Sequence, residues 1–223
     1  RNLKVDIDNQ AAELIGADLA LESNRKPTEE ALAFIDSLKE VSLGFAKEER
    51  FMSMLRIPKA NASRFVQVRA LEGPYPFYGA VETHPDQVFN EFSKHAGLYI
   101  DNSLFLQYNA SFGDTVQLGS KSYPILGSIT SQPGQSAFSG AMAPSLFIPL
   151  EQLKDAGLQQ QGSRIEYHFY FKLPKNFAID KKIENWKDKL STLQLRSSTI
   201  ATTKENTGRS FADMASFMEL VGF

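Results

Sequence analysis

The sequence has 223 residues and a nearly neutral charge balance, with 24 Lys and Arg against 26 Asp and Glu. Hydrophobic residues make up 42% of it and cysteine is absent. The chain can therefore bury a core of its own, but it cannot build a disulfide scaffold or a thiolate zinc site. It also lacks the basic surface with which nucleic-acid-binding proteins neutralise phosphates, so we expect no nucleic-acid partner.

The two ends of the chain predict a processed protein or an excised fragment. Arg1 stands where an initiator Met or an apolar leader would be. At the other end, 214–223 carries one charge, Glu219, and stops within an apolar pattern. The long uncharged run 122–150 is interrupted by glycine and proline, so it predicts no membrane span.

Charge, glycine and proline are distributed unevenly along the chain. Residues 1–72 hold 23 charged side chains, 73–162 hold 10, and 163–223 hold 17. The middle part also contains 10 of the 14 glycines and 7 of the 10 prolines. Since domain boundaries tend to fall at such shifts, the sequence predicts one discontinuous domain, 1–73 with 163–223, and an inserted domain, 74–162.

The first flank predicts a strand, a helix and two further strands. The strand covers 18–22, and Thr28 then caps a helix whose first turn is acidic. One apolar face of this helix is expected to enter the core: Ala31, Phe34 or Ile35, and Leu38. Strands are predicted at 51–57 and 65–70.

The middle part predicts shorter elements separated by turns. A helix is expected to open at Thr83 and to close at Gly97. The remaining elements are a strand at 98–101, a helix at 103–108, a hairpin of 113–119 with 122–129, a strand at 146–148, and a short helix at 149–157. The Gly/Ser/Pro/Ala-rich loop 132–145 carries Phe138 and Met142, and loops of this length are usually functional or mobile.

The second flank repeats the pattern of the first. Apolar and polar residues alternate strictly over 165–173, which predicts a half-buried strand with His168 on its polar face. A helix over 179–193 and a strand at 196–203 complete a second β-α-β unit, and a capping box at Ser210 predicts a terminal helix. Two such units favour an α+β layer with helices on one face of a sheet.

The residue types needed for catalysis or metal binding do not occur at the required spacing. The three histidines, His84, His95 and His168, form no pair with ligand spacing. The run 113–122 resembles a phosphate-binding loop only superficially, because it has no Gly-Lys pair and sits in a hairpin. We therefore expect no catalytic residue, no metal site and no cofactor.

Five aromatic or sulfur-containing side chains are candidates for contact with a partner or cargo. They are Tyr75, Phe77, Tyr78, Phe138 and Met142. The first three cluster with Pro74 and Pro76 and form either a binding platform or a hinge packed on the core. The burial tendencies of aromatic side chains favour the hinge.

Several passages, in order, resemble FtsX-like ABC transporter permeases. Residues 12–25 (AELIGADLALESNR) are similar to the start of the MacB-like periplasmic core domain, just after the first membrane helix of that family. Residues 68–79, 112–119 with 125–129, and 146–150 resemble later passages of the domain. Residues 208–223 resemble the helix leading into the second membrane span.

The resemblance implies a porter-like subdomain of two β-α-β units with an inserted β-rich, Sabre-like subdomain, in the periplasmic part of a bacterial inner-membrane protein. It further implies three kinds of partner: a cytoplasmic ATP-binding subunit, a second permease copy or a paralogue, and a periplasmic partner or amphiphilic cargo. In this family, ATP hydrolysis drives the export or release of lipoprotein, lipid or peptide cargo, often by mechanical transmission. The alternative is a free-standing secreted ligand-binding protein or hydrolase, for which the 132–145 loop and the aromatic residues are the motivation.

Overall fold

The computed structural model describes residues 3–86, 94–133, 143–153, 156–158 and 164–209, and for 3–7 only the backbone. The elements, in order, are α1 (Leu3–Ile15), β1 (Leu19–Ser23), α2 (Glu29–Val41), β2 (Gly44–Ile57), η1 (Pro58–Ala60), β3 (Ala62–Glu72), β4 (Glu82–His84), β5 (Leu98–Asp101), α3 (Asn102–Gln107), β6 (Thr115–Leu118), β7 (Lys121–Ser131), β8 (Ser145–Pro149), η3 (Leu150–Leu153), β9 (Glu166–Lys172), α5 (Ile179–Thr192) and β10 (Arg196–Thr199). A further helix occupies 200–209.

One mixed sheet of ten strands runs through the molecule in the order β10-β1-β9-β2-β3-β8-β5-β7-β4, with β6 paired to β2 and β7. Both β10 and β9 are antiparallel to β1, and β2 is antiparallel to β9. The units β1-α2-β2 and β9-α5-β10 are therefore interleaved, which is a split β-α-β arrangement. The predicted α+β class with two β-α-β units is confirmed.

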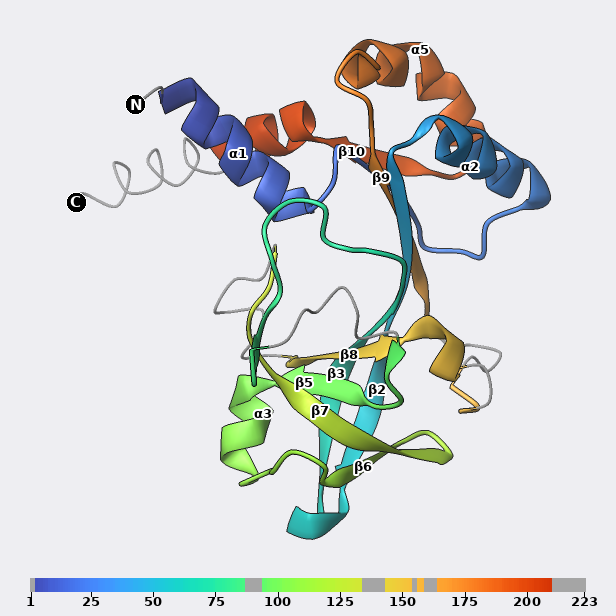
Figure 1. Cartoon of the computed structure of the whole chain (residues 1–223). Coiled ribbons are helices and arrows are strands. Elements are labelled where there is room, and N and C mark those ends of the chain that lie inside the picture. Colours follow the sequence, from blue (N-terminus) through green and yellow to red (C-terminus); the bar gives the residue numbers. More distant parts are fainter. Residues whose placement is uncertain (1–2, 87–93, 134–142, 154–155, 159–163, 210–223) are drawn as a thin grey trace, which may run out of the picture.

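Helices cover both faces of this part of the sheet. α2 and α5 pack on one face, where Leu19, Leu21 and Phe171 of the strands meet Ile35 and Leu190 of the helices. α1 and the 200–209 helix lie on the opposite face (Figure 1). Alternate strand residues therefore serve two different cores, as the two-residue period of a strand requires.

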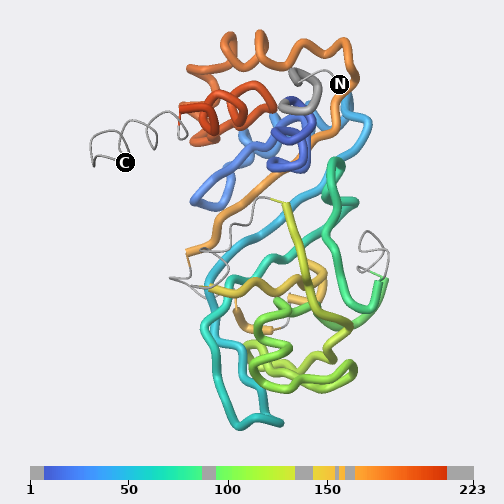
Figure 2. Tube along the Cα trace, turned by 90° about the vertical axis from the view of Figure 1, so that its left-hand side faces the viewer, coloured from blue at the N-terminus to red at the C-terminus, as the bar shows by residue number. Residues whose placement is uncertain are grey.

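Strands β2 and β3 carry the sheet from these helices to the far end of the elongated molecule (Figure 2). β2 has 14 residues, a length of about 46 Å at the usual rise per residue. Its lower half, with that of β3, packs on β5–β8, α3 and η3 through buried residues that include Phe51, Leu55, Val66 and Val68. Since β2 and β3 pair with strands of both predicted subdomains, the division at 73 and 163 stays a prediction.

The local signals of α2 and of the hairpin are confirmed. Thr28 Oγ1 accepts a hydrogen bond from the backbone N–H of Ala31 at 3.2 Å, which is the predicted cap. The four predicted core residues of the helix are all buried. The hairpin forms as β6 and β7, with Leu118 paired to Lys121.

Four local predictions are wrong or lie at least partly outside the described residues. Thr83 does not open a helix, because 82–84 pairs with β7 as β4, and 87–93 of the helix predicted from it are not among the described residues. The strand predicted at 196–203 ends at Thr199, where a helix begins. The side-chain hydroxyls of Thr199 and Thr202 each accept a hydrogen bond from the backbone N–H of the other residue. The helix predicted from Ser210 and most of the loop 132–145 are not among the described residues.

The middle of the polar face of β9 is buried while its ends, Glu166 and Lys172, are partly exposed, so the prediction of a half-buried strand is wrong for the centre of β9. His168 and Tyr170 have exposed fractions of 5% and 3%. Their face lies under α1 and the 200–209 helix, whereas Phe169 and Phe171 face α2 and α5. A strand covered on both faces can still alternate in polarity if its polar side chains find partners inside.

Candidate functional site

A cavity of about 600 Å³ lies between the sheet and the two helices on its α1 side. Leu14 and Ile15 of α1, together with Thr203 of the 200–209 helix, form one wall. The opposite wall is the sheet, which presents the charged side chains of Glu22, Arg50, Arg69 and His168. The cavity therefore combines an apolar helix wall with an ionised sheet wall.

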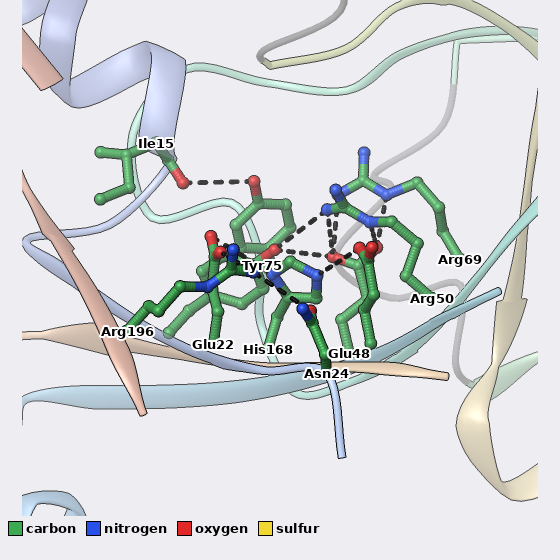
Figure 3. Close-up of polar contacts among 11 residues, drawn as sticks. Ile15, Glu22, Asn24, Glu48, Arg50, Arg69, Tyr75, His168 and Arg196 are labelled. Carbon is green, nitrogen blue, oxygen red and sulfur yellow. Dashed lines mark hydrogen bonds and ion pairs between the residues drawn. The ribbon is translucent and has the colours of Figure 1, made fainter. Parts of the chain in front are cut away.

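Glu48 is the centre of the polar network in Figure 3, and its side chain is completely buried. Its Oε1 accepts from Arg69 Nε at 2.6 Å and Arg50 Nε at 3.0 Å. Its Oε2 accepts from Arg69 Nη2 at 2.9 Å, Arg50 Nη2 at 3.2 Å and the Tyr170 hydroxyl at 2.8 Å. Burial alone would raise the pKa of Glu48, but Arg50 and Arg69 outweigh it and hold that pKa well below its ordinary value.

Arg69 is enclosed on all sides, with a 5% exposed side chain. Its Nη1 donates to Gln132 Oε1 at 2.7 Å, and its guanidinium lies 4.5 Å from the centre of the Phe147 ring. Burial opposes its charge, and Glu48 more than compensates, so the pKa of Arg69 is raised. The group stays cationic at every physiological pH.

Two tyrosines in ring contact connect this network to α1. The ring centroids of Tyr75 and Tyr170 are 4.1 Å apart with the planes tilted by 33°, and the Tyr75 hydroxyl donates to the carbonyl of Ile15 at 3.3 Å. The backbone N–H of Phe77 donates to the Gly16 carbonyl at 2.8 Å. The end of α1 is thus bonded to the loop that follows β3.

His168 lies between two carboxylates at the edge of the network. Its Nδ1 is 3.6 Å from Glu22 Oε1, and its Nε2 is 3.5 Å from Glu166 Oε2. Burial would lower the pKa of His168, but Glu166 and Glu22 together raise it. Arg196 balances part of this negative charge, because its Nη2 lies 3.4 Å from Glu22 Oε2.

The arrangement can hold charge but offers no reacting group of an obvious kind. Two guanidiniums share the carboxylate of Glu48, and the carboxylate of Glu22 on the same cavity wall offsets the remaining positive charge. Among the described residues, no group of three or more His, Asp or Glu side chains could hold a metal ion. Within the same residues, no helix is long and apolar enough to cross a membrane.

The structure brings only part of the predicted contact set to this cavity. Tyr75 lines it and is 4% exposed. Phe77 instead packs beneath Gly44, and the Tyr78 hydroxyl donates to the Asp18 carboxylate at 2.9 Å. Phe138 and Met142 lie outside the described residues, so the role of this set in binding stays a prediction.

Sequence reasoning did not find the residues that build the network. Glu48 and Arg50 belong to a charged run, and the side chains of such runs are usually exposed to solvent. Their partner Arg69 is 21 positions from Glu48. No sequence signal pointed to Arg69, because Gln67 and Arg69 alternate with apolar residues in the predicted strand 65–70 and so suggest a solvent-facing side.

Comparison with known proteins gives one relative in sequence and several in structure. The chain is 25% identical over 166 residues to YbbP of Escherichia coli (strain K12), an ABC transporter permease that is itself uncharacterized. The match covers 74% of this chain and 20% of YbbP, so the chain spans about a fifth of that relative. No protein-family profile matches the sequence.

The fold agrees with three solved structures of low sequence identity. The periplasmic region of MacB from Actinobacillus actinomycetemcomitans superposes with a TM-score of 0.59 at 12% identity, over 88% of this chain and 95% of that one. A domain of a permease protein from Porphyromonas gingivalis gives 0.51 at 13% identity, over 82% and 89%. The extracellular domain of the transporter YknZ from Gram-positive bacteria gives 0.50 at 11% identity, over 81% and 100%.

These matches agree with the resemblance carried by the ordered motifs, and they extend over most of the chain. The chain is similar in sequence to an ABC transporter permease and has the fold seen in the periplasmic region of MacB and the extracellular domain of YknZ.

Proposed function

We propose that the chain works as the periplasmic domain of an ABC transporter permease and couples ATP hydrolysis in the cytoplasm to the movement of cargo outside the inner membrane. The ATP-binding subunit would be a separate polypeptide, and a second permease copy or a paralogue would complete the transporter. The domain would transmit motion mechanically and would not itself form a channel.

The single observation that carries this proposal is the pairing of α1 with the 200–209 helix. The two helices lie side by side at one end of the molecule in both views (Figures 1 and 2). Lys204 Nζ lies 2.7 Å from Asp8 Oδ1, which ties the helices together although these residues are 196 positions apart. Two helices that enter and leave a domain side by side can act on it as a lever when they shift relative to each other, and the partly exposed ion pair between them allows such a shift.

The polar network behind the two helices connects this lever rigidly to the sheet. The end of α1 is bonded to the loop after β3 through Ile15 and Gly16, and Tyr75 from that loop packs against Tyr170 of the Glu48 cluster. From there the 11 register pairs of β2 and β3 reach the far end of the domain. Continuous backbone ladders resist bending, so a displacement of the helices would reach the distal β5–β8 region.

A crosslink between the two helices tests the proposal. In the full-length permease assembled with its ATP-binding subunit, Asp8→Cys with Lys204→Cys would be joined by a short bismaleimide. We expect ATP hydrolysis by the complex to fall about fivefold or more, because motions of this kind set turnover in many coupled enzymes.

The matched control joins two paired strands that are not expected to move relative to each other. Gln117 and Ser122 are register partners in the β6–β7 hairpin, so Gln117→Cys with Ser122→Cys receives the same reagent. The control should retain normal ATP hydrolysis. Equal rates with and without the helix crosslink, or an equal loss in both crosslinked proteins, would contradict mechanical coupling through the helices.

A further inference from the structure

We propose that the cavity and the adjoining face of β2 and β3 form a binding site for a single-chain amphiphile with a monoanionic headgroup, of which a fatty acid is the simplest. The headgroup would bind at Arg50, and the chain would lie along the hairpin. The assignment rests on the proposed function in one respect only, which is that the amphiphile would be the cargo of the transporter. The site itself is argued from its own geometry.

The face that holds the ionic network continues as an exposed apolar strip. Residues two apart on a strand point to the same side, so Glu48, Arg50, Met52 and Met54 share one face of β2. On β3, Phe65 is the register partner of Met54, and Gln67 that of Met52. Met52, Met54 and Phe65 are 40%, 52% and 51% exposed, and we call these three residues the apolar strip.

The strip and the cavity are continuous. Gln67 lines the cavity and stands on β3 between Arg69 and Phe65, at the usual spacing of about 6.6 Å along each side of a strand. Arg50 lies in the same way next to Met52. A molecule with its head in the cavity would therefore meet apolar surface within one side-chain spacing.

An open donor identifies the headgroup. The Arg50 side chain is 24% exposed, and among the described residues its Nη1 has no hydrogen-bond partner. A carboxylate can accept from this donor and matches the planar fork of a guanidinium. A single negative charge on the headgroup limits its repulsion from the Glu22 carboxylate, which lines the same cavity.

The backbone of the strip favours a hydrocarbon over a peptide. β2 and β3 are paired to each other over the whole strip, from Arg50 opposite Arg69 to Met54 opposite Phe65. A face with paired backbone has no free N–H or C=O to receive an extended peptide, whose own amides would stay unmatched. A hydrocarbon chain needs only apolar contact, and methionine side chains adapt well to such chains.

Calorimetric titration of the chain with dodecanoate, below its critical micelle concentration, tests the assignment. Hexanoate keeps the headgroup and shortens the chain, and dodecanol keeps the chain and removes the charge. We expect both to bind at least about tenfold more weakly than dodecanoate, since each buried methylene contributes up to about fourfold and a close charge pair at least tenfold.

Two sets of variants locate the binding. Met54→Gln with Phe65→Gln removes the apolar strip, and Arg50→Gln removes the exposed guanidinium; each is expected to raise the dissociation constant for dodecanoate about tenfold. Arg50→Lys keeps the charge and should restore part of the affinity. The control, Leu43→Gln with Leu106→Gln, replaces two apolar residues that are 68% and 70% exposed elsewhere, and should bind as the wild type does.

The outcomes separate the site from the proposed function. Absence of dodecanoate binding, or equal affinities of the wild type and the strip variant, would overturn the site. Dodecanoate binding that the strip and Arg50 variants weaken, and the control does not, supports it whatever the helix crosslink does to ATP hydrolysis. Failure of the crosslink experiment alone would remove the transport role and leave the binding site in place.

Discussion

Arg50 of β2 is the register partner of Arg69 of β3, so two guanidinium groups face each other across one rung of the ladder. Like charges in this position repel. The Glu48 carboxylate resolves the conflict, because it lies diagonally from Arg69 and accepts hydrogen bonds from both cations (Figure 3). The cluster is stable only as a set of three, and removal of the carboxylate should therefore be far more harmful than loss of a surface ion pair.

The variant Glu48→Gln should lower the free energy of unfolding by about 3–5 kcal/mol, the usual cost of leaving a buried charge without its partner. Urea denaturation measures this. Glu72→Gln is the control, because Glu72 pairs with Lys47 at 3.0 Å while 61% of its side chain is exposed. Such a pair contributes about 0–1 kcal/mol, so similar losses in the two variants would refute the special role of Glu48.

The protonation of His168 should make the protein more stable at mildly acidic pH than at alkaline pH. Because the folded-state pKa of His168 is raised above 6.5, its contribution is fully present below pH 6.5 and is lost as the pH rises through the folded value. His168→Gln should flatten this part of the profile of unfolding free energy against pH. In NMR titrations, Glu22→Gln should lower the pKa of His168; an unchanged titration would show that Glu22 does not act on it.

Substitution of Gly16 should loosen the joint between α1 and the loop after β3. Gly16 has a φ of +70°, and a Cβ there would lie 2.8 Å from Tyr75 Cε2. Gly16→Ala is therefore expected to cost about 1–3 kcal/mol through backbone strain and displacement of Tyr75. Gly113→Ala is the matched control, since Gly113 has a φ of +83° but open space around it. A larger loss in Gly113→Ala would show that packing against Tyr75 is unimportant.

The cap of α2 gives a prediction that depends on one hydrogen bond. Thr28→Ala removes the acceptor of the Ala31 N–H and should lower the free energy of unfolding by about 1 kcal/mol. Thr28→Ser keeps a hydroxyl and should restore most of it. If the serine variant were as unstable as the alanine variant, the loss would come from packing of the threonine methyl and not from the cap.

Elements held by local chemistry could be predicted from the sequence. The cap at Thr28 and the helical spacing of its core face act within a few residues, and so does the turn of the β6–β7 hairpin. The ordered motifs also predicted the fold. These motifs can be recognised in the sequence without knowledge of tertiary contacts.

The candidate site could not be predicted, because tertiary contacts decide it. The alternation of β9 correctly indicated two kinds of face, but only the packing of α1 and the 200–209 helix shows that the face of His168 and Tyr170 is also buried. Likewise, the spacing of Thr83 suits a helix cap, and pairing with β7 makes it a strand residue instead. Helix packing in the first case and strand pairing in the second override the local sequence pattern.

Surface labelling of the full-length protein in spheroplasts tests the central claim most directly. The chain has no cysteine, and in a full-length protein whose other cysteines, if any, are replaced by serine, Leu106→Cys places a single thiol at a position of α3 that is 70% exposed. A maleimide that cannot cross the inner membrane should label this thiol in intact spheroplasts as fully as after lysis. Labelling that required lysis would place the domain in the cytoplasm and contradict its assignment to the periplasmic side of an ABC transporter.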